Sequence, residues 1–413
     1  MTIPARAITF LVAGRCCCMR RLMIGLALMV TACGQTQAQP ASSPATPATA
    51  TAGAPLLFAV LQAKDTASPN QLNTVVIAGL DGQTIATATF APMPVPAIGA
   101  CIGAIDPPSA HAAAGKVFYA DATGAVRSLG IDGKVTTVAT FPMTSKQQML
   151  SFAVSPDGST ILGTIFTIPL NAVTCDGSAS PVAYTLDAYS ATSGASSRLV
   201  YHQSWTGSQN VMALTGWDAI GPIGTYPTVW ATQGGGTGSR LGVIVRIDAS
   251  TMKPLAPFAG QGSCQVWQSV PSGAFVCTLA PVMTGDGTAQ QSVDSPVSVR
   301  RADGSEMWGF KLTSTNPAFG PILAPDERHV TICCADVAGP GFAQVVAGQD
   351  GSKATMAGGF TTTGWLDSQT MVGYSHPDPL QQPPFSLGYI RSSDLSRFTS
   401  MGLYGEFVGT VRG

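Results

Sequence analysis

The stretch TVVIAGLDGQTIATATF, residues 74–90, decides the fold because its pattern returns as AVRSLGIDGKVTTVATF at residues 125–141. Each copy has an apolar run, an Asp-Gly turn and a second run rich in Val, Ile and Thr. This order is the signature of a β-hairpin, and Asp-Gly between such runs is a strong short-range hairpin signal. The stretch therefore predicts antiparallel β structure.

The same pattern continues along the chain. Further copies occupy residues 184–202, 242–258, 297–310, 344–360 and 387–401. The turns recur about every fifty residues, a period typical of propeller blades. A second kind of hairpin lies between the copies, at residues 151–165, 211–232, 264–279, 321–334 and 364–374. Two hairpins per period predict an all-β fold, a seven-bladed β-propeller of four-stranded blades over residues 56–413.

Two turns of the second kind resemble a known group of propellers. SPDG at residues 155–158 and APDE at residues 324–327 resemble the turns of TolB-like and WD-repeat-like β-propellers. No Gly-His or Trp-Asp pair recurs as in true WD repeats, so the resemblance implies a fold and not a function. Two separate β-sandwich domains are the alternative, because repeat spacing alone also fits them.

The two ends of this region predict how the ring closes. LLFAVL at residues 56–61 supplies only a second strand to blade one, whereas EFVGTV at residues 406–411 follows a complete seventh blade. Pairing the two segments would remove exposed strand edges, which is the physical benefit of a closed β architecture. We therefore expect residues 406–411 to form the innermost strand of blade one.

Residues 19–35, MRRLMIGLALMVTACGQ, have the order of a secretory leader. Two arginines precede nine apolar or small residues, too few to span a bilayer. The run Val30-Thr31-Ala32-Cys33 resembles the lipobox of bacterial lipoproteins. This resemblance implies that Cys33 is acylated and becomes the first residue after cleavage. Residues 1–32 are then upstream residues plus a signal peptide, with Met19 as the expected start.

Residues 33–55 are expected to form the lipidated cysteine and a linker. From Thr36 to Pro55 the sequence has no charged and no aromatic residue and is rich in Pro, Ala, Ser and Thr. Such a composition buries too little apolar surface to fold, so it predicts a disordered linker. We expect the propeller to lie in the cell envelope, lipid-anchored on the extracytoplasmic side of a bacterial membrane, with the membrane as one partner.

Composition and motifs narrow the function. Charged residues make up 10% of the chain and the formal net charge is −1, with no Lys/Arg run, so nucleic acid is not an expected partner. The sequence lacks GxSxG, HExxH, P-loop and dinucleotide-binding motifs, and its four histidines show no ligand spacing. We predict no catalytic residue, no cofactor and no metal site, and we expect a monomer.

Candidate binding residues lie in the long connections. We number the strands of a blade outward from the propeller axis. The connection from strand two to strand three and the connection from one blade to the next then lie on the same side of the propeller. That side holds most of the long segments, namely 91–100, 167–182, 202–210, 280–294, 335–342 and 375–386. Long loops on a rigid scaffold often carry function. The candidates are Asp176, His202, Trp205, Asp286, His376 and Asp378. Each candidate also has a simpler explanation. The aspartates can bond nearby amides in turns, the tryptophan can pack under its own loop, and His202 can end an outer strand.

Six cysteines follow Cys33, and an even number in an exported chain favours disulfides over metal binding. Cys264 and Cys277 flank a Pro-Ser-Gly turn and are expected to form a disulfide. Cys101 is expected to open the inner strand of blade two, and Cys175 to lie in a loop of blade three on the same side, which would allow a second bridge. The adjacent Cys333 and Cys334 are expected to be reduced, because neighbouring strand residues point to opposite faces.

These features predict a binding or scaffold module for a protein, peptide or glycan in the envelope or outside the cell. The innermost strands carry few acids, which favours binding, and their placed residues are Phe152, Val154, Trp267, Ile322 and Leu323. The alternative is a propeller enzyme, hydrolase or lactonase-like, with an axial metal held by inward-pointing acids or histidines. A structural envelope spacer is a third interpretation.

Overall fold

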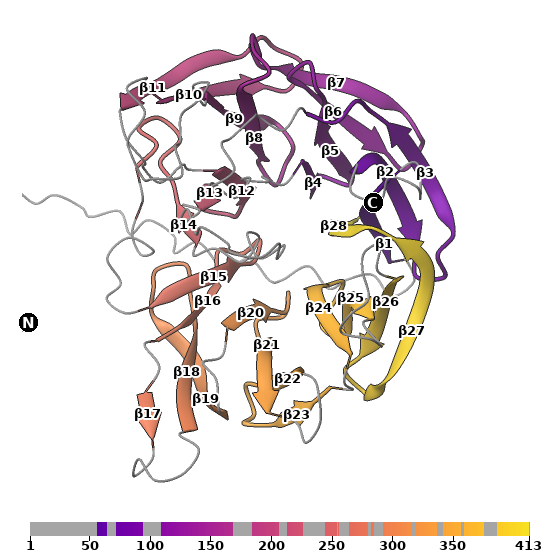
Figure 1. Ribbon diagram of the computed structural model, residues 1–413, viewed down its shortest axis with the longest axis vertical. Coiled ribbons are helices and arrows are strands. Elements are labelled where there is room, and N and C mark those ends of the chain that lie inside the picture. Colours follow the sequence, from indigo (N-terminus) through magenta and orange to yellow (C-terminus); the bar gives the residue numbers. More distant parts are fainter. Residues whose placement is uncertain are drawn as a thin grey trace, which may run out of the picture. The chain divides into compact units, whose positions relative to one another are not determined.

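The computed structural model describes residues 56–63, 72–93, 109–167, 184–205, 213–225, 244–253, 255, 264–279, 282–284, 292–314, 319–336, 342–356, 359–375 and 386–412. These residues form seven antiparallel sheets, which follow one another in chain order in Figure 1. Within this part of the chain, no helix is long and apolar enough to cross a membrane.

Blades one to three have four strands each, named from the innermost strand outward. Blade one contains β28 (Glu406–Val411), β1 (Leu57–Ala63), β2 (Leu72–Gly79) and β3 (Thr84–Thr89). Blade two contains β4 (Ala110–Ala113), β5 (Lys116–Ala120), β6 (Ala125–Gly130) and β7 (Val135–Thr140). Blade three contains β8 (Gln148–Val154), β9 (Thr160–Thr167), β10 (Tyr184–Thr192) and β11 (Arg198–Trp205).

The other four blades vary in strand number. Blade four contains β12 (Ala213–Trp217), β13 (Pro222–Thr225) and β14 (Ile244–Arg246). Blade five contains β15 (Gln265–Ser269), β16 (Phe275–Thr278), β17 (Val282–Thr284), β18 (Ser292–Arg300) and β19 (Glu306–Ser314). Blade six contains β20 (Phe319–Leu323), β21 (His329–Asp336), β22 (Phe342–Gly348) and β23 (Lys353–Thr355). Blade seven contains β24 (Phe360–Trp365), β25 (Thr370–Ser375), β26 (Ser386–Arg391) and β27 (Asp394–Tyr404).

The expected ring closure is confirmed. β28 pairs with β1 in antiparallel register, with Leu57 opposite Val411. Strands of each blade contact those of the next, and β24 of blade seven contacts β28, so the seven sheets form a closed seven-bladed propeller. Gly364 in blade seven leaves room for the ring of Phe407, because a side chain at this position would meet that ring. The five innermost residues named from the sequence all lie in the innermost strands β8, β15 and β20.

Blades four and five depart from four strands. In blade four the chain turns back after β14, and Leu255 N–H donates to the Arg246 carbonyl at 2.7 Å. No fourth strand forms in the described residues, and Pro254 and Pro257 lack the N–H groups that a strand there would need. In blade five the expected loop 280–294 contains β17, which pairs with β18 beside β16.

Two other boundaries differ from the expectation. The innermost strand of blade two, β4, begins at Ala110, and Cys101, which was expected to open it, lies outside the described residues. Pro107 and Pro108 just before β4 have no N–H to donate to a ladder. The outermost strand of blade three runs on to Trp205, so the expected loop 202–210 begins later than residue 202.

The repeated Asp-Gly pair explains the outer hairpins. Asp81 Oδ1 accepts the Gln83 N–H at 3.0 Å, and Gly82 between them has a φ of 78°, in the left-handed region that favours glycine. The corresponding aspartates of blades two, five and six accept the same bond from the residue two positions later, in the turns at Asp132, Asp303 and Asp350. A local sequence signal therefore fixes these turns.

The apolar core is divided among the blade interfaces, which we call seams. Each seam has its own cluster of buried side chains, from the blade one and two seam around Ile77 and Leu129 to the blade seven and one seam around Phe58 and Val372. The cluster around Phe275, with six buried residues, joins blades four and five. Because every sheet packs on both faces, neighbouring blades stabilise each other.

Three side chains also bond to the backbone of the innermost strand of the next blade. Ser151 Oγ accepts the Leu214 N–H at 2.9 Å, which joins blades three and four. Gln268 Oε1 accepts the Leu323 N–H at 2.6 Å, which joins blades five and six. In the seam between blades six and seven, the acceptor is Gln344 Oε1, 2.7 Å from the Thr362 nitrogen. These bonds satisfy backbone donors at the inner edges of the sheets.

The blade four and five seam contains a buried ion pair. Arg246 and Asp218 have 0% and 1% of their side-chain surface exposed, and the Arg246 Nη2 lies 2.5 Å from Asp218 Oδ2. Arg246 also donates to the Gly273 and Ala302 carbonyls of blade five, at 3.1 and 3.4 Å. Ser269 of blade five donates to Asp218 Oδ2 at 3.0 Å. The pair therefore links the two blades through several hydrogen bonds.

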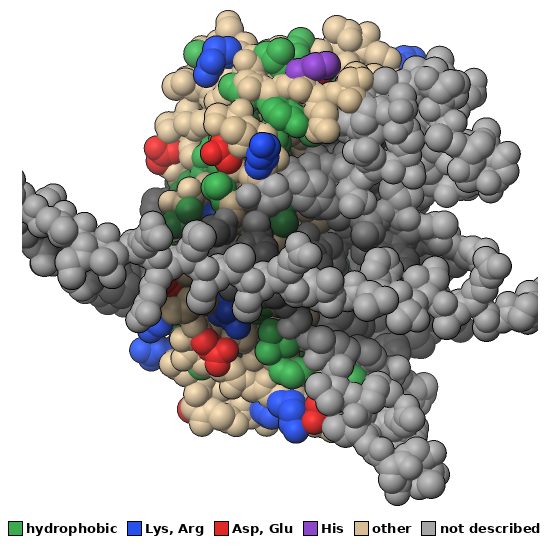
Figure 2. All heavy atoms as spheres, turned by 90° about the vertical axis from the view of Figure 1, so that its left-hand side faces the viewer, with side chains coloured by type: hydrophobic (Ala, Val, Ile, Leu, Met, Phe, Trp, Pro, Cys, Tyr) green, Lys and Arg blue, Asp and Glu red, His purple; other side chains and the backbone are tan. Residues whose placement is uncertain are grey.

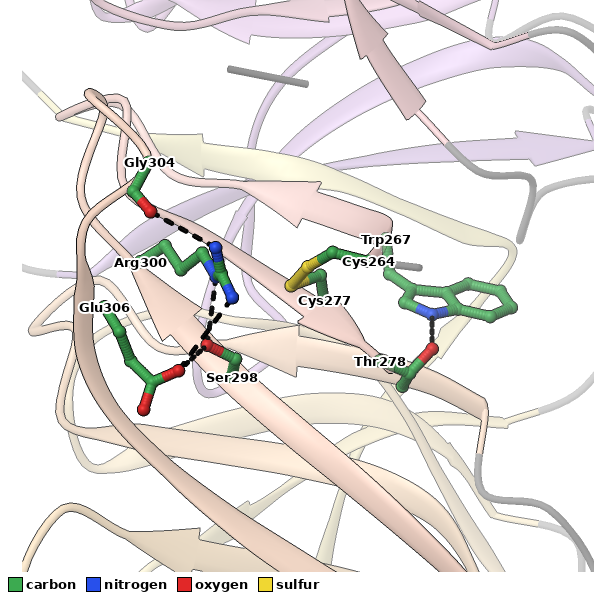
Figure 3. Close-up of a disulfide and its surroundings, with 8 residues drawn as sticks. All are labelled: Cys264, Trp267, Cys277, Thr278, Ser298, Arg300, Gly304 and Glu306. Atoms are coloured by element: carbon green, nitrogen blue, oxygen red, sulfur yellow. Dashed lines mark hydrogen bonds and ion pairs between the residues drawn. A yellow bond between two sulfur atoms is a disulfide. The ribbon is translucent and has the colours of Figure 1, made fainter. Parts of the chain in front are cut away.

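The expected disulfide between Cys264 and Cys277 is confirmed and lies in the same seam (Figure 3). Cys277 is opposite Val266 in the strand register, so the bridge runs diagonally between β15 and β16 with a Cα–Cα distance of 5.6 Å. Figure 3 also shows Trp267 Nε1 donating to Thr278 Oγ1, at 2.8 Å. The expectation of a reduced Cys333 is wrong, because Cys333 is disulfide-bonded.

Candidate binding surface

The propeller has two sides with different connections. On the turn side lie the short connections within hairpins, such as the β2–β3 turn at residues 80–83 and the β18–β19 turn at residues 301–305. On the loop side lie the connections between hairpins, which are mostly longer. Leu57, the first residue of β1, is paired with Gly79, the last residue of β2. The chain therefore enters blade one on the turn side.

Most of the residues predicted from the sequence fall outside the described residues. These are Cys33, Cys101, Asp176, Cys175, Asp286, His376 and Asp378. Trp205 is the last residue of β11, and the structure describes its backbone only. His202 is described in full and lies in β11, not in a loop as expected. It lies near the end of the outermost strand of blade three, as in the simpler explanation given above.

His202 forms a hydrogen-bonded pair with Asp187 of the neighbouring strand β10. The two residues are directly opposite in the register, and His202 Nδ1 lies 2.5 Å from Asp187 Oδ1. The imidazole side chain is 55% exposed and the carboxyl side chain 21% exposed. The carboxylate holds the ring in one orientation through Nδ1, which leaves Nε2 to interact with a ligand.

Apolar and aromatic side chains lie beside this pair. Leu199, three residues earlier in β11, is 48% exposed, which is unusual for a leucine in a strand. Burial, and then the negative charge of Asp187, raise the pKa of Tyr189, whose ring meets Phe141 of blade two in a T-shaped contact. Tyr201 donates its hydroxyl hydrogen bond to Gln203 Oε1 at 2.7 Å, and both residues alternate with His202 and so lie on the other face of the sheet. We call residues 187, 189, 199 and 202, which share one face, the blade-three rim.

The blade-three rim combines the groups that a polar ligand with an apolar part requires. Its oriented imidazole can donate or accept one hydrogen bond, and Leu199 offers apolar surface a few residues away. On the described part of the face in Figure 2, acidic and basic side chains lie interspersed among hydrophobic and polar ones. The chemistry of the rim is thus hydrogen bonding and apolar contact, the usual means of recognising a peptide or glycan.

Sequence reasoning missed Asp187 as the partner of His202. Equal steps outward from the Ser193-Gly194 turn would set residue 187 opposite residue 200, but the register shifts between Ala188 and Tyr189 and pairs Asp187 with His202. It also missed the internal role of His111 in β4. Burial lowers the pKa of His111 to about 4, and a hydrogen bond with the Phe152 backbone partly opposes that shift. The His111 ring meets Phe152 edge-on, 4.7 Å between centroids, in the blade two and three seam.

Within the described ranges, no group of three or more His, Cys, Asp or Glu side chains is arranged to hold a metal ion. The buried Asp218 and Arg246 are bonded to backbone and side-chain groups of blades four and five, so they serve the seam.

Comparisons with known proteins support the fold alone. No protein-family model matches the sequence, and no curated protein matches it. Among solved structures, an oligogalacturonate lyase in complex with manganese aligns at 10% identity and a TM-score of 0.45, over 78% of this chain and 83% of that one. A putative TolB from Agrobacterium tumefaciens aligns at 13% identity and a TM-score of 0.32, over 73% of this chain and 82% of that one.

BamB from Moraxella catarrhalis aligns at 10% identity and a TM-score of 0.35, over 73% of this chain and 89% of that one. At these identities and scores the similarity extends to the propeller architecture and carries no argument about activity. The chain is thus an all-β, seven-bladed propeller with structural similarity to TolB, BamB and oligogalacturonate lyase.

Proposed function

We propose that this protein is a lipid-tethered, extracytoplasmic binding module that takes a protein, peptide or glycan ligand at its loop side. The observation that carries the proposal is the position of Leu57 on the turn side, next to Gly79. A chain anchored through Cys33 enters the propeller there. The opposite side, with the longer connections, then points away from the membrane.

The linker sets how far the propeller stands from the membrane. A flexible chain the length of residues 33–55 has an r.m.s. end-to-end distance of about 25 Å. This distance is short enough to keep the turn side nearest the lipid surface on average. It is long enough to leave the loop side and the outer strands accessible to a ligand.

The blade-three rim supports the same orientation. β11 runs from the turn side toward the loop side, and His202 lies three residues before its end at Trp205. The oriented imidazole and the exposed Leu199 are therefore near the side that the tether leaves free.

Two experiments test the two halves of the proposal. For the anchor, Cys33→Ala should leave an uncleaved or a shed protein, because this cysteine is both the cleavage signal and the anchor. A mature Cys33→Ala protein that stays membrane-bound after a high-salt wash contradicts it. For the ligand side, a photo-crosslinking residue at position 204, an exposed position on the same face of β11 as His202, should give saturable adducts that excess unlabelled protein competes away.

The matched control for the crosslink is position 134, an exposed residue of the β6–β7 turn on the turn side. It should give no saturable adduct. His202→Ala should weaken the crosslink from position 204 while leaving the melting temperature unchanged, because the histidine is exposed. Equal crosslinking from positions 134 and 204 would overturn the proposed orientation.

A further inference from the structure

The outer hairpin tips of several blades pack against the blade that precedes them. Gly194 of blade three donates its N–H to the Val138 carbonyl of blade two at 2.8 Å. Lys353, just after the tip of blade six, donates to the Lys311 carbonyl of blade five at 2.6 Å. Gly82 of blade one lies so close to the backbone of blade seven that a side chain there would clash. These tips are therefore covered by the ring itself.

The tip of blade two is different, because its hydrogen bonds stay within its own hairpin. Gly130 N–H donates to the Lys134 carbonyl at 3.1 Å, and Gly133 N–H donates to the Gly130 carbonyl at 3.0 Å. A side chain added at Gly133 would meet no atom within 4 Å. Within the described part of the chain, no hydrogen bond or ion pair joins residues 131–135, which we call the blade-two tip, to another blade.

Two aliphatic side chains are exposed at this free tip. Ile131 is 44% exposed and Val135 is 41% exposed, at the two ends of one turn. In blade one, Leu80 and Thr84 have the corresponding places in the repeat, but Leu80 packs against the blade seven and one seam and Thr84 is polar. One exposed apolar side chain is common on a protein surface, whereas a pair at one free tip is a feature of contact surfaces. The tip therefore has the character of a contact with something outside the propeller.

Basic side chains accompany the apolar pair. Lys134 is exposed within the turn, and the exposed Lys116 is directly opposite Gly130 in the strand register. Asp132 is the one acid of the tip, and its carboxylate accepts the Lys134 N–H at 3.0 Å. Apolar side chains beside lysines are typical of surfaces that lie in a bilayer interface, where the lysines meet anionic headgroups. The chemistry of the tip thus fits an anionic lipid surface.

The chain enters the propeller beside this tip. Leu57, the first residue of β1, packs against the cluster of the blade one and two seam, which contains Leu129. Leu129 is paired with Val135 of the tip. The entry point and the tip therefore lie on the turn side of one seam. With the lipid tether proposed above, a linker of about 25 Å holds this part of the turn side near the membrane.

We propose that the blade-two tip inserts into the surface of an anionic membrane, with Ile131 and Val135 at the boundary between headgroups and acyl chains. Lys134 and Lys116 bind the anionic headgroups. This inference rests on the lipid tether of the proposed function, which brings the tip to the membrane. The tether and the tip then hold the propeller at two points, so the loop side keeps one orientation toward its ligand.

Quenching by labelled lipids tests the insertion. An environment-sensitive fluorescent residue replaces Val135 in the full chain, and a control chain carries it in place of Tyr404, which is 51% exposed at the loop-side end of β27. Each chain is bound to vesicles of phosphatidylcholine and phosphatidylglycerol with brominated acyl chains. The residue at position 135 should be quenched and its emission blue-shifted, whereas the residue at position 404 should show neither change.

Two ways of binding the vesicles separate this proposal from the proposed anchor. One set of chains is bound through acylated Cys33. A second set carries Cys33→Ala and a histidine tag inserted at residue 36, which binds nickel-chelating lipid. Failure of the first set alone to bind contradicts the anchor. A vesicle-bound chain of either set that shows no quenching at position 135 overturns the insertion.

Single variants identify the side chains that insert. Ile131→Ser and Lys134→Gln change exposed residues, so each should leave the melting temperature unchanged and lower the ratio of inserted to free tip about fivefold. The control is Lys146→Gln, which removes an exposed lysine from the connection between blades two and three and should have no effect.

Three further results would overturn the proposal. The first is equal quenching at positions 135 and 404, and the second is unchanged quenching in both tip variants. The third is a blue shift at position 135 that appears without vesicles and grows with protein concentration, because it would assign the tip to a second copy of the chain.

Discussion

Blade one and the seam between blades four and five are held together by different interactions. Blade one is completed by a backbone ladder, β28 on β1, and nine buried residues join it to blade seven. The blade four and five seam has six buried residues, two of them cysteines of one disulfide, beside a fully buried ion pair. Blade four has three strands in the described residues.

The comparison shows that one ring can use two ways of joining its parts. Where the sheets are complete, hydrophobic burial and backbone hydrogen bonds suffice. Where blade four, with three described strands, meets blade five, a covalent bond and directional polar contacts hold the neighbours in register. Such contacts are costly to break, because a buried charge that loses its partner keeps its full desolvation cost.

The largest effect is expected from removing the closing strand. Deleting residues 406–413 takes away the innermost strand of blade one and exposes the edge of β1. The free energy of unfolding of a domain is about 5–15 kcal/mol, and losing a whole strand with its packing should remove most of it. We expect loss of cooperative thermal unfolding or of soluble expression.

A chain ending at Val411 is the control for this truncation, since it keeps β28 intact. It should melt like the full chain. If the chain lacking residues 406–413 also melts cooperatively at the original temperature, ring closure by β28 contributes little and the comparison fails.

A smaller effect is expected at the buried ion pair. Asp218→Leu leaves Arg246 charged and buried without its carboxylate, so the free energy of unfolding should fall by about 3–5 kcal/mol. Adding Arg246→Met removes the stranded charge and should recover part of the loss. Urea denaturation measures both. Equal stability of the single and double variants would show that the charge itself is unimportant at this seam.

Removing the disulfide should come next in size. Cys264→Ala with Cys277→Ala opens a cross-link between residues 13 apart, which in the chain-entropy view lowers the free energy of unfolding by about 3 kcal/mol. Thr278→Val is the control, because it keeps the disulfide, loses only the bond from Trp267 and should cost about 1 kcal/mol. If the variant without both cysteines is as stable as the control, the disulfide does not stabilise the blade four and five seam.

The smallest effect is expected from lowering the pH, and it concerns His111 in the blade two and three seam. The pKa of His111 is lowered from 6.5 to about 4 by burial, so the folded state holds the neutral ring while the unfolded chain takes up a proton. Stability is then fully present above pH 6.5 and falls as the pH drops toward 4. Between pH 7 and pH 5 the loss should be about 2 kcal/mol.

His111→Gln should abolish this part of the pH dependence. Urea denaturation of both proteins at a series of pH values measures it, and the two curves should converge near neutral pH. Identical slopes in the variant and the parent would assign the acid sensitivity to other groups.

The sequence predicted the features that depend on local chemistry. An Asp-Gly turn is fixed by one side-chain bond and one left-handed glycine, so the hairpins, their order and the ring closure could be placed from the residues alone. The hairpin expected at 242–258 has only its first strand, β14, in the described residues, and Pro254 and Pro257 stand where its second strand was expected. Neither proline can donate a ladder bond.

The contacts between blades could not be predicted in the same way. Arg246 lies in a strand pattern where a charged residue normally faces water, and its burial depends on carbonyls 27 and 56 residues further along the chain. Within blade three, His202 was a candidate as a loop residue, and its partner Asp187 came only with the register of the hairpin. Long-range contacts depend on the packing of whole blades, which residue spacing does not give.

The pairing of β28 with β1 also sets the order of folding. β1 is the first described strand in the chain and β28 the last, so the two must wait for every other blade. Closing so long a loop is slow, and the backbone edge of β1 stays available to other chains until it happens. A newly made chain therefore carries an aggregation-prone edge for as long as the other blades take to appear, and chaperone protection of β1 should matter most in that interval.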